Sequence, residues 1–337
     1  MATEGAKPKL TGLPLLAVAL SVVVFVQAAF VLSYVGALHE PKPHGVRLAV
    51  VGTSPLPAAI GKQFSLRLEP YPAEAAARKA IDERKVDAAF IAPSTLIVVP
   101  AAGAPMATAL GNVFAAAGAA AKVEVAVVPV HPLPAHDASG NVSFLVVMAL
   151  IIGGYLASTI GMAFGGPPTR RRRRLASLAV VSVVGALMTD VIAGPALGAL
   201  PSSKFFELWG AFVLVMTAVS FATAGLQAIL GAAGTLVVVV LFVIFGAPAS
   251  GGTVPSPFLP DFWRTFGPYL PAGAGTTLVR NIVYFGGNAV GLALVVLAGY
   301  LAAGALVVTA VRRSSEAPTA LAAEAEASAA ATAIIVS

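Results

Sequence analysis

The chain has 337 residues, of which 58% are hydrophobic and only 11% are charged. That balance excludes an ordinary soluble domain and predicts a polytopic α-helical membrane protein. The formal net charge of +6 does not indicate a nucleic-acid partner, because five of the 21 basic residues form a single run, Arg170 to Arg174, between apolar segments. The sequence contains no cysteine, which excludes disulfides and thiolate metal sites.

The first apolar segment covers residues 13–38, which is long enough for a membrane-spanning helix of about 20 residues. Lys7 and Lys9 precede it, as basic residues precede the apolar core of a cleaved signal peptide, but this segment is about twice as long as such a core. We therefore expect residues 1–12 to be a cytoplasmic N-terminus and residues 13–38 to be an uncleaved transmembrane anchor.

Residues 39–141 alternate between strand-like and helix-like stretches, which predicts a small α/β domain with a mostly parallel sheet. The stretches typical of strands are "VRLAVVG", "FSLRLEPY", "VDAAFIAP", "TLIVVPA" and "KVEVAVVPV", and those typical of helices are "PAEAAARKAIDERK" and "MATALGNVFAAAG". The sequence contains no recognisable nucleophile–base set and no GxxxxGK[ST] phosphate loop. We therefore expect that the chain is not an enzyme and carries no ATPase of its own.

The four histidines of the chain lie near the two ends of this domain: His39, His44, His131 and His136. Because both ends return to the membrane, the imidazoles are able to approach one another, and with Glu40 or Asp137 they would form a zinc or copper site. In the other interpretation they are solvated residues of the proline-rich linkers "HEPKPHG" and "HPLPAHD". The sequence favours the linker interpretation, so no metal and no cofactor is expected.

Five further apolar segments follow within residues 142–313, and together with the first they predict six transmembrane helices. Their ranges are 142–164, 175–200, 205–224, 229–246 and 288–311. The short stretch "GLQ" at 225–227 is the expected corner between the fourth and fifth helices. The fold class is thus a six-helix membrane protein with a small exported α/β domain inserted between its first and second helices.

Lysine and arginine are distributed unequally between the two ends of these helices. The end that holds the termini has nine, Lys7, Lys9, Arg170 to Arg174, Arg312 and Arg313, and the opposite short loops have three, Lys204, Arg264 and Arg280. The positive-inside rule therefore places both termini in the cytoplasm and residues 39–141 outside. The alanine-, valine-, glycine- and arginine-rich composition indicates a bacterial protein of the plasma membrane.

Several charged residues lie within or beside the apolar segments. Asp190 is either a cap on a helix broken at Gly194 and Pro195 or part of a translocation pathway, since a carboxylate inside a membrane is costly. The run from Arg170 to Arg174 is either a stop signal that binds anionic headgroups, at about 1 kcal/mol per charge, or a docking loop for a cytoplasmic partner.

Residues 254–287 are too broken by glycine and proline to cross a bilayer and too apolar for an ordinary loop. Within them, Thr276 to Phe285 separate at 100° per residue into an apolar arc and a polar arc of Thr276, Thr277, Arg280, Asn281 and Tyr284. An aromatic cluster suited to headgroup depth precedes this stretch: Phe258, Phe262, Trp263, Phe266 and Tyr269.

This pattern predicts an outer re-entrant segment that roofs or gates a cavity, and the other interpretation is an inert lid at the lipid surface. The gating and translocation candidates are Asp190, Trp263, Arg280, Asn281 and Tyr284.

The stretch "SGGTVPSPFLPDFWRTFGPYLPAGAGTTLVRNIVYFGG" resembles the corresponding region of the ABC-2-type transporter permease superfamily, in particular its branch similar to the bacterial phage-infection protein. "AIDERKVDAAFIAP" is similar to a region of that family's exported domain. The resemblance implies an export permease that forms a homodimer and a loop at 165–174 that contacts a separate cytoplasmic ATPase subunit. It also implies an outer re-entrant segment over residues 254–287, with Arg280 on its polar face.

The leading functional hypothesis is an ABC-2-like export permease subunit that moves a hydrophobic or amphipathic molecule outward, with membrane lipid as its surroundings. The alternative is a non-transporting membrane anchor whose exported domain binds a secretion or cell-envelope partner. Residues 314–337 are rich in alanine, glutamate and serine without a periodic apolar face, so a disordered cytoplasmic tail is expected there.

Overall fold

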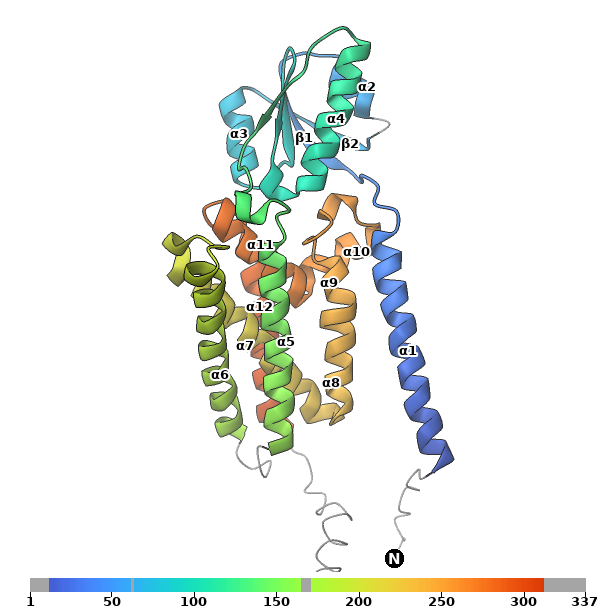
Figure 1. The fold of residues 1–337 in the computed structure, drawn as a ribbon, viewed down its shortest axis with the longest axis vertical. Helices are drawn as coiled ribbons and strands as arrows, with labels where there is room; N and C mark the ends of the chain where they lie inside the picture. The colour runs from blue at the N-terminus through green and yellow to red at the C-terminus, as the bar shows by residue number, and fades with distance from the viewer. Residues whose placement is uncertain (1–11, 62–63, 165–170, 312–337) are drawn as a thin grey trace, which may run out of the picture.

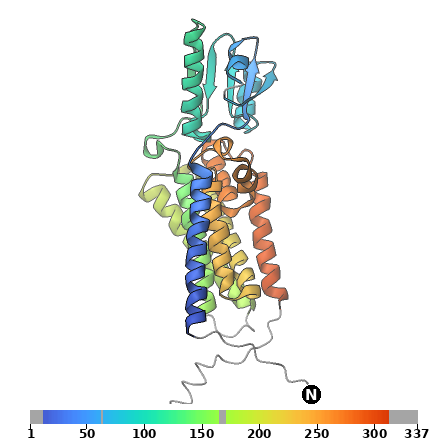
Figure 2. The same ribbon diagram turned by 90° about the vertical axis from the view of Figure 1, so that its right-hand side faces the viewer.

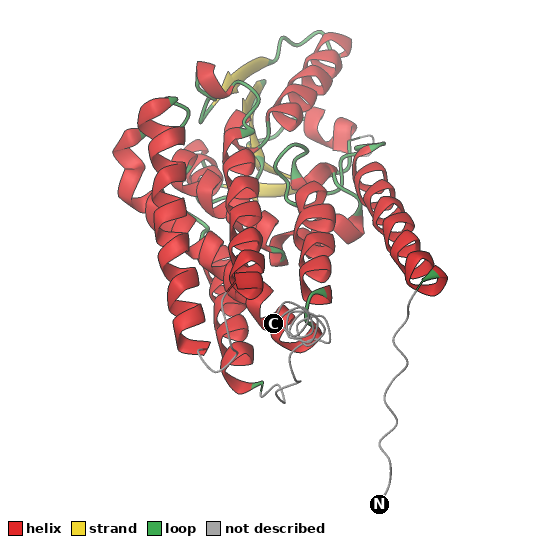
Figure 3. Cartoon of the chain, turned by 60° about the horizontal axis from the view of Figure 1, so that its bottom comes forward, coloured by secondary structure: helices red, strands yellow, loops and turns green. Residues whose placement is uncertain are grey.

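The computed structural model describes residues 12–61, 64–164 and 171–311, and its helices stand together beneath a small α/β domain (Figure 1). The expected cytoplasmic N-terminus, apart from residue 12, and the expected tail at 314–337 lie outside the described residues. The protein is mostly helical (Figure 3), and the strands gather at one end of it (Figure 1).

Within the described residues, five helices are long and apolar enough to cross a membrane. They are α1 (Leu13–Leu38), α5 (Val142–Phe164), α6 (Arg171–Val191), α7 (Phe205–Leu230) and α12 (Gly291–Ala310). The π-helical turn η4 (Ile192–Ala196) continues α6 past Pro195. A shorter apolar helix follows α7, and it consists of α8 (Ala233–Val238), the π-helical η6 (Val239–Phe245) and α9 (Gly246–Ala249).

The prediction that the chain turns at residues 225–227 is wrong, because α7 continues without interruption to Leu230. The chain turns instead at Gly231, whose φ of 65° favours glycine, and at Ala232. Gln227 resembled a corner residue in the sequence because it is polar. In the structure it is buried, and its amide nitrogen donates to Thr235 Oγ1 at 2.8 Å.

Helix α7 forms the centre of the bundle and packs against α5, α6 and most extensively α12. Helix α1 stands at the side of the bundle and contacts mainly its shorter apolar helix, through η6 and α9, while Ala37 near its end packs in a cluster with Leu259 and Trp263 (Figures 1 and 2). The Ser33 hydroxyl of α1 donates to the carbonyl of Ile244 at 2.6 Å. Most of the large apolar side chains of α1 remain exposed.

Between α1 and α5 lies a five-stranded sheet of β1 (Val46–Val51), β2 (Leu66–Tyr71), β3 (Ala88–Ile91), β4 (Thr95–Val98) and β5 (Ala126–Pro129). The strand order is β2-β1-β3-β4-β5, and only the β3–β4 pair is antiparallel, in agreement with the mostly parallel sheet expected. Helices α2 (Leu56–Gly61), α3 (Glu74–Asp82) and α4 (Ala104–Ala120) complete this α/β domain.

The α/β domain rests directly on one end of the helical bundle (Figure 2). The segment after α9 forms this contact through α10 (Asp261–Phe266) and α11 (Pro271–Tyr284). Phe258 and Phe285 of the bundle join the apolar core of the domain, where Phe258 meets Phe64 edge-on at 6.1 Å between ring centroids. A backbone hydrogen bond of 2.7 Å from His44 N to Pro257 O also crosses the junction.

Candidate functional site

Helix α11 is buried inside the end of the bundle that faces the α/β domain. Eleven of its 14 residues are buried, and it packs against α5, α7, α9 and α12. The small residues at its start permit this position: a Cβ on Gly273 would lie 2.0 Å from the carbonyl oxygen of Gly267, and one on Gly275 would lie 2.8 Å from Val147. The interpretation as an inert lid at the lipid surface is therefore wrong, because the apolar arc of α11 contacts other helices.

Arg280 of α11 connects this helix to the loop after α9 and to the linker before α5, and only 7% of the residue is exposed. Its guanidinium donates to the carbonyl oxygens of Gly251 at 2.9 Å, Gly252 at 3.0 Å and Gly140 at 3.4 Å. All three acceptors are neutral, and Arg280 forms no ion pair among the described residues. The guanidinium is thus hydrogen-bonded to carbonyl oxygens, and the carboxylate of Asp137 is the nearby negative charge that acts on it.

The other candidates of this segment hold it in place at separate points. The Tyr284 hydroxyl donates to Asp137 Oδ2 at 3.0 Å, while Oδ1 of the same carboxylate accepts the amide of Asn141 at 2.8 Å at the start of α5. Asn281 donates to the carbonyl of Ala289 at 3.3 Å in the turn toward α12. Trp263 stacks on Phe245 at 5.5 Å, in a different apolar cluster. These residues do not line one common path.

A cavity of about 250 Å³ lies between the α/β domain and the α10–α11 segment. Thr277 and Arg280 of α11 and Arg264 of α10 lie on its bundle side, and the α/β domain closes the opposite side. Residues of the 254–287 segment form the floor of this cavity, so this is not the cavity within the helices that the segment is predicted to roof, and that roof stays a prediction. The remaining lining residues are His44, Gly45, Arg47, Arg84, Asp87, Ala102, Met106, Ser250, Gly251, Ser256 and Pro257.

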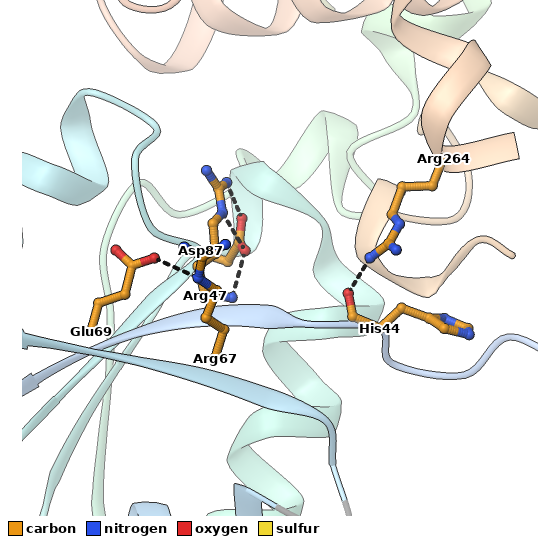
Figure 4. A network of polar contacts seen from close by, with 6 residues as sticks. All are labelled: His44, Arg47, Arg67, Glu69, Asp87 and Arg264. Atoms are coloured by element: carbon orange, nitrogen blue, oxygen red, sulfur yellow. Dashed lines mark hydrogen bonds and ion pairs between the residues drawn. The ribbon is translucent and has the colours of Figure 1, made fainter. Parts of the chain in front are cut away.

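The charges of this cavity are predominantly positive, and Asp87 is the one carboxylate among the described residues that line it. Asp87 accepts from Arg47 Nε at 3.1 Å, from Nη2 at 2.8 Å and from the Arg47 backbone amide at 2.9 Å (Figure 4). Burial opposes the charged form of Arg47, but the hydrogen bonds and negative charge of Asp87 outweigh it and raise the pKa of Arg47. Arg264 donates to the carbonyl of His44 at 2.6 Å (Figure 4).

Arg84 follows α3 and projects its guanidinium over the ring of Phe285, 4.5 Å from the ring centroid. Burial lowers the pKa of Arg84, and the nearby charge of Asp87 partly offsets that effect. Sequence reasoning missed Arg47, Arg84, Asp87 and Arg264 as members of one site. The only signal available was the density of charge in "DERKVD", within a chain that is 11% charged.

The Arg47–Asp87 pair gives a direct prediction about stability. We expect Asp87→Asn to lower the free energy of unfolding by about 2 kcal/mol, because it removes a charged acceptor of three hydrogen bonds from a side chain that is 5% exposed. Chemical unfolding of the detergent-solubilised protein measures the change. Glu69→Gln is the matched control, since its partner Arg67 is 73% exposed, and we expect a change below about 0.5 kcal/mol. Equal effects of both substitutions would contradict the prediction.

The arginine run lies at the opposite end of the bundle and is largely helical. Arg170 lies outside the described residues, whereas Arg171–Arg174 form the first turn of α6 and not a loop. Arg174 turns inward and donates to Gln227 Oε1 at 2.5 Å, and Arg171 donates to the carbonyl of Thr309 at 3.0 Å. Arg172 and Arg173 are exposed and are the members of the run available for a partner.

Asp190 lies in α6 at 1% exposure, far along the chain from the junction residues. Its Oδ2 atom is buried without a hydrogen-bond partner, and the carboxylate caps no backbone amide among the described residues. The capping interpretation is therefore wrong, because the π-helical turn η4 continues the helix past Gly194 and Pro195. A buried polar atom without a partner is a local cost to the fold.

Asp190→Asn tests whether the buried carboxylate destabilises the fold. We expect the substitution to raise the free energy of unfolding by about 1 kcal/mol, because it replaces an unpaired buried carboxylate with a neutral side chain of the same shape. Thermal unfolding in detergent measures the change. Glu207→Gln is the control, because Glu207 is exposed and paired with Lys204 at 2.9 Å. A destabilised Asp190→Asn variant would show that the carboxylate has a stabilising partner.

The four histidines do not converge. His39 and His136 are exposed, His131 contacts Asp82 at 2.7 Å and packs on Phe285, and His44 lies at the cavity. In the part of the chain that the structure describes, no three histidine, aspartate or glutamate side chains are placed to hold a metal ion. The less favoured interpretation, in which the four histidines approach one another, is therefore not what the structure shows for these residues.

The fold and its five candidate membrane-spanning helices are those of a mostly helical protein, consistent with a polytopic membrane protein. Comparison of the chain with protein-family models, curated proteins and solved structures found no match. The resemblance to ABC-2-type permeases therefore contributes to the functional argument only as a proposal.

Proposed function

We propose that this chain is an export permease subunit, similar to ABC-2-type permeases, that moves a hydrophobic or amphipathic molecule outward across the bacterial plasma membrane. The observation that carries the proposal is the position of α11. It is a 14-residue helix, too short to cross a bilayer, yet it is buried among the long apolar helices at the end that faces the α/β domain. Backbone breaks at membrane depth are tolerated where protein or a water-filled cavity surrounds them.

The order of the elements supports the same proposal. An apolar helix, an α/β domain, four further apolar helices, the broken segment α10–α11 and a last apolar helix succeed one another along the chain. In this proposal the shorter helix of 233–249 completes six crossings, with the π-helical η6 extending its path. Arg171–Arg174 then lie on the cytoplasmic side with both termini, and the α/β domain lies outside.

The proposal assigns the energy source to a separate cytoplasmic ATPase subunit, and it assigns the docking contact to Arg172 and Arg173. Their exposure at the end of the bundle opposite the α/β domain supports this assignment. The apolar side chains that α1 leaves exposed support a position against lipid or against a second copy of the chain, as in a homodimeric permease.

Purification of the tagged full-length chain in mild detergent from its own cells, followed by mass spectrometry, tests the proposal. We expect an ATPase subunit to co-purify with the wild type and to be lost from the double variant Arg172→Glu, Arg173→Glu. Lys122→Glu, an equally exposed charge reversal in the α/β domain, is the control and should retain the subunit. Co-purification of an envelope or secretion protein without any ATPase would support the non-transporting anchor instead.

A further inference from the structure

We propose that the cavity between the α/β domain and α11 is a binding site for a phosphate-bearing anion. Its lining contains four arginines, Arg47, Arg84, Arg264 and Arg280, against the single carboxylate of Asp87. Arg84 follows α3, Arg264 lies on α10 and Arg280 lies on α11, so the fold brings these charges together from separate segments. The site does not depend on transport and stands whether or not the chain is a permease.

The positive charges of the cavity are only partly compensated by the protein. Asp87 is fully engaged by Arg47, and Arg264 contacts Asp261, whose side chain is 77% exposed. Arg84 and Arg280 form no ion pair among the described residues: one lies over an aromatic ring and the other binds three carbonyl oxygens. The only negative charges among the described residues that act on them, Asp87 on Arg84 and Asp137 on Arg280, do so without an ion pair, and an anion bound in the cavity would stabilise both guanidinium groups.

The polar groups around the cavity match the acceptor oxygens of a phosphate. Guanidinium groups bind phosphate through paired hydrogen bonds in a planar fork. Thr277 and Ser256 also line the cavity, whereas the Ser250 hydroxyl donates to the carbonyl of Ala247 at 2.7 Å, and Nδ1 of His44 is buried without a hydrogen-bond partner among the described residues. The volume of about 250 Å³ lies below the range of about 300–1,000 Å³ typical of drug-sized ligands. The site therefore fits a phosphate or diphosphate group and not a bulky organic molecule.

A phosphate group that binds in this cavity could come from either of two sources, a lipid headgroup or a free phosphate in solution. Arg264 of the cavity lies on α10 between Phe262 and Phe266, each 54% exposed, as is Tyr269. Exposed aromatic side chains of this kind are typical of headgroup depth in a membrane. A phosphate on a lipid would therefore reach Arg264 with its acyl chains beside the aromatic rings.

Calorimetric titration of the full-length protein in detergent tests the proposal. The probes are inorganic pyrophosphate and dioctanoyl phosphatidic acid, with dioctanoylglycerol as the neutral lipid control. We expect saturable binding of at least one phosphate probe, no binding of dioctanoylglycerol, and weakening as the salt concentration rises. Arg84→Gln should weaken binding at least tenfold, whereas Arg67→Gln, an exposed arginine outside the cavity, should change it less than twofold.

The two phosphate probes distinguish the two sources. Binding of pyrophosphate alone identifies a soluble anion site, and binding of phosphatidic acid alone identifies a headgroup site. The wild-type protein supplies a second measurement that does not depend on any variant's folding: the bound probe should slow modification of Arg84 and Arg264 by phenylglyoxal, read by peptide mass spectrometry, and leave Arg67 unaffected. Absence of saturable binding, or equal modification with and without the probes, would overturn the proposal.

Discussion

Arg280→Met is expected to lower the free energy of unfolding by about 3 to 5 kcal/mol. Arg280 donates to the carbonyls of Gly140, Gly251 and Gly252 at a position that is 7% exposed. Methionine fills part of the same volume but donates nothing, so three backbone acceptors lose their partner away from water. Those acceptors belong to the linker before α5 and to the loop after α9, so the α/β domain should also loosen from the bundle.

Chemical unfolding in detergent measures the stability, and limited proteolysis of the 130–141 linker measures the loosening. Arg78→Met is the matched control, because Arg78 is half-exposed on α3 and its guanidinium pairs with Glu74 at 2.7 Å. That control should change stability by less than about 0.5 kcal/mol. If Arg280→Met unfolds at the wild-type denaturant concentration, the three hydrogen bonds do not hold the junction.

Gly304→Ala is expected to lower stability by about 3 kcal/mol, and it should disturb the contact between α7 and α12. A Cβ at position 304 would lie 2.2 Å from the carbonyl carbon of Phe221 and 2.3 Å from its oxygen. Those atoms are backbone and cannot rotate away, so the two helices must separate. Gly225 on α7 faces the same contact, where its own Cβ would lie 3.1 Å from Gly304 Cα.

Gly299→Ala is the internal control on the same helix, because no atom outside its own helix lies within 4 Å of a Cβ added there. Alanine is favoured over glycine in a helix by about 1 kcal/mol, so this substitution should be neutral or stabilising. The two variants therefore differ in the sign of their effect on the thermal unfolding temperature in detergent. A Gly304→Ala protein as stable as Gly299→Ala would contradict the packing.

Local periodicity in the sequence predicted most of the helical elements and the alternation in the α/β domain. The apolar stretch at 142–164 corresponds to α5 residue for residue, and the strand-like stretches correspond to β1 through β5. Helices and strands of this kind are determined by the spacing of apolar residues that are close in the sequence, so a single sequence is enough to predict them. The end of α7 was mistaken because Gln227 is polar for a tertiary reason, its burial in a network with Ser158 and Thr235.

The candidate site was predictable only in part. The two-sided pattern of residues 276–285 correctly indicated a helix, but it could not reveal that both arcs meet protein. Arg47, Asp87, Arg84 and Arg264 converge from distant points of the sequence, and no local spacing encodes their meeting. The histidines are a case where the sequence left two interpretations open, because positions near the two ends of a domain do not by themselves say whether the side chains meet, and among the described residues they form no metal-binding group.

The most direct test of the account is the side of the membrane on which each end of the bundle lies. The natural chain has no cysteine, so single cysteines at exposed positions can be labelled without background. In sealed right-side-out vesicles, a membrane-impermeant maleimide should label Lys122→Cys and Thr253→Cys directly, and Arg172→Cys and Ala232→Cys only after permeabilisation. Labelling of residues 232 and 253 from the same side would show that the helix of 233–249 does not cross the membrane, and it would contradict the six-crossing permease.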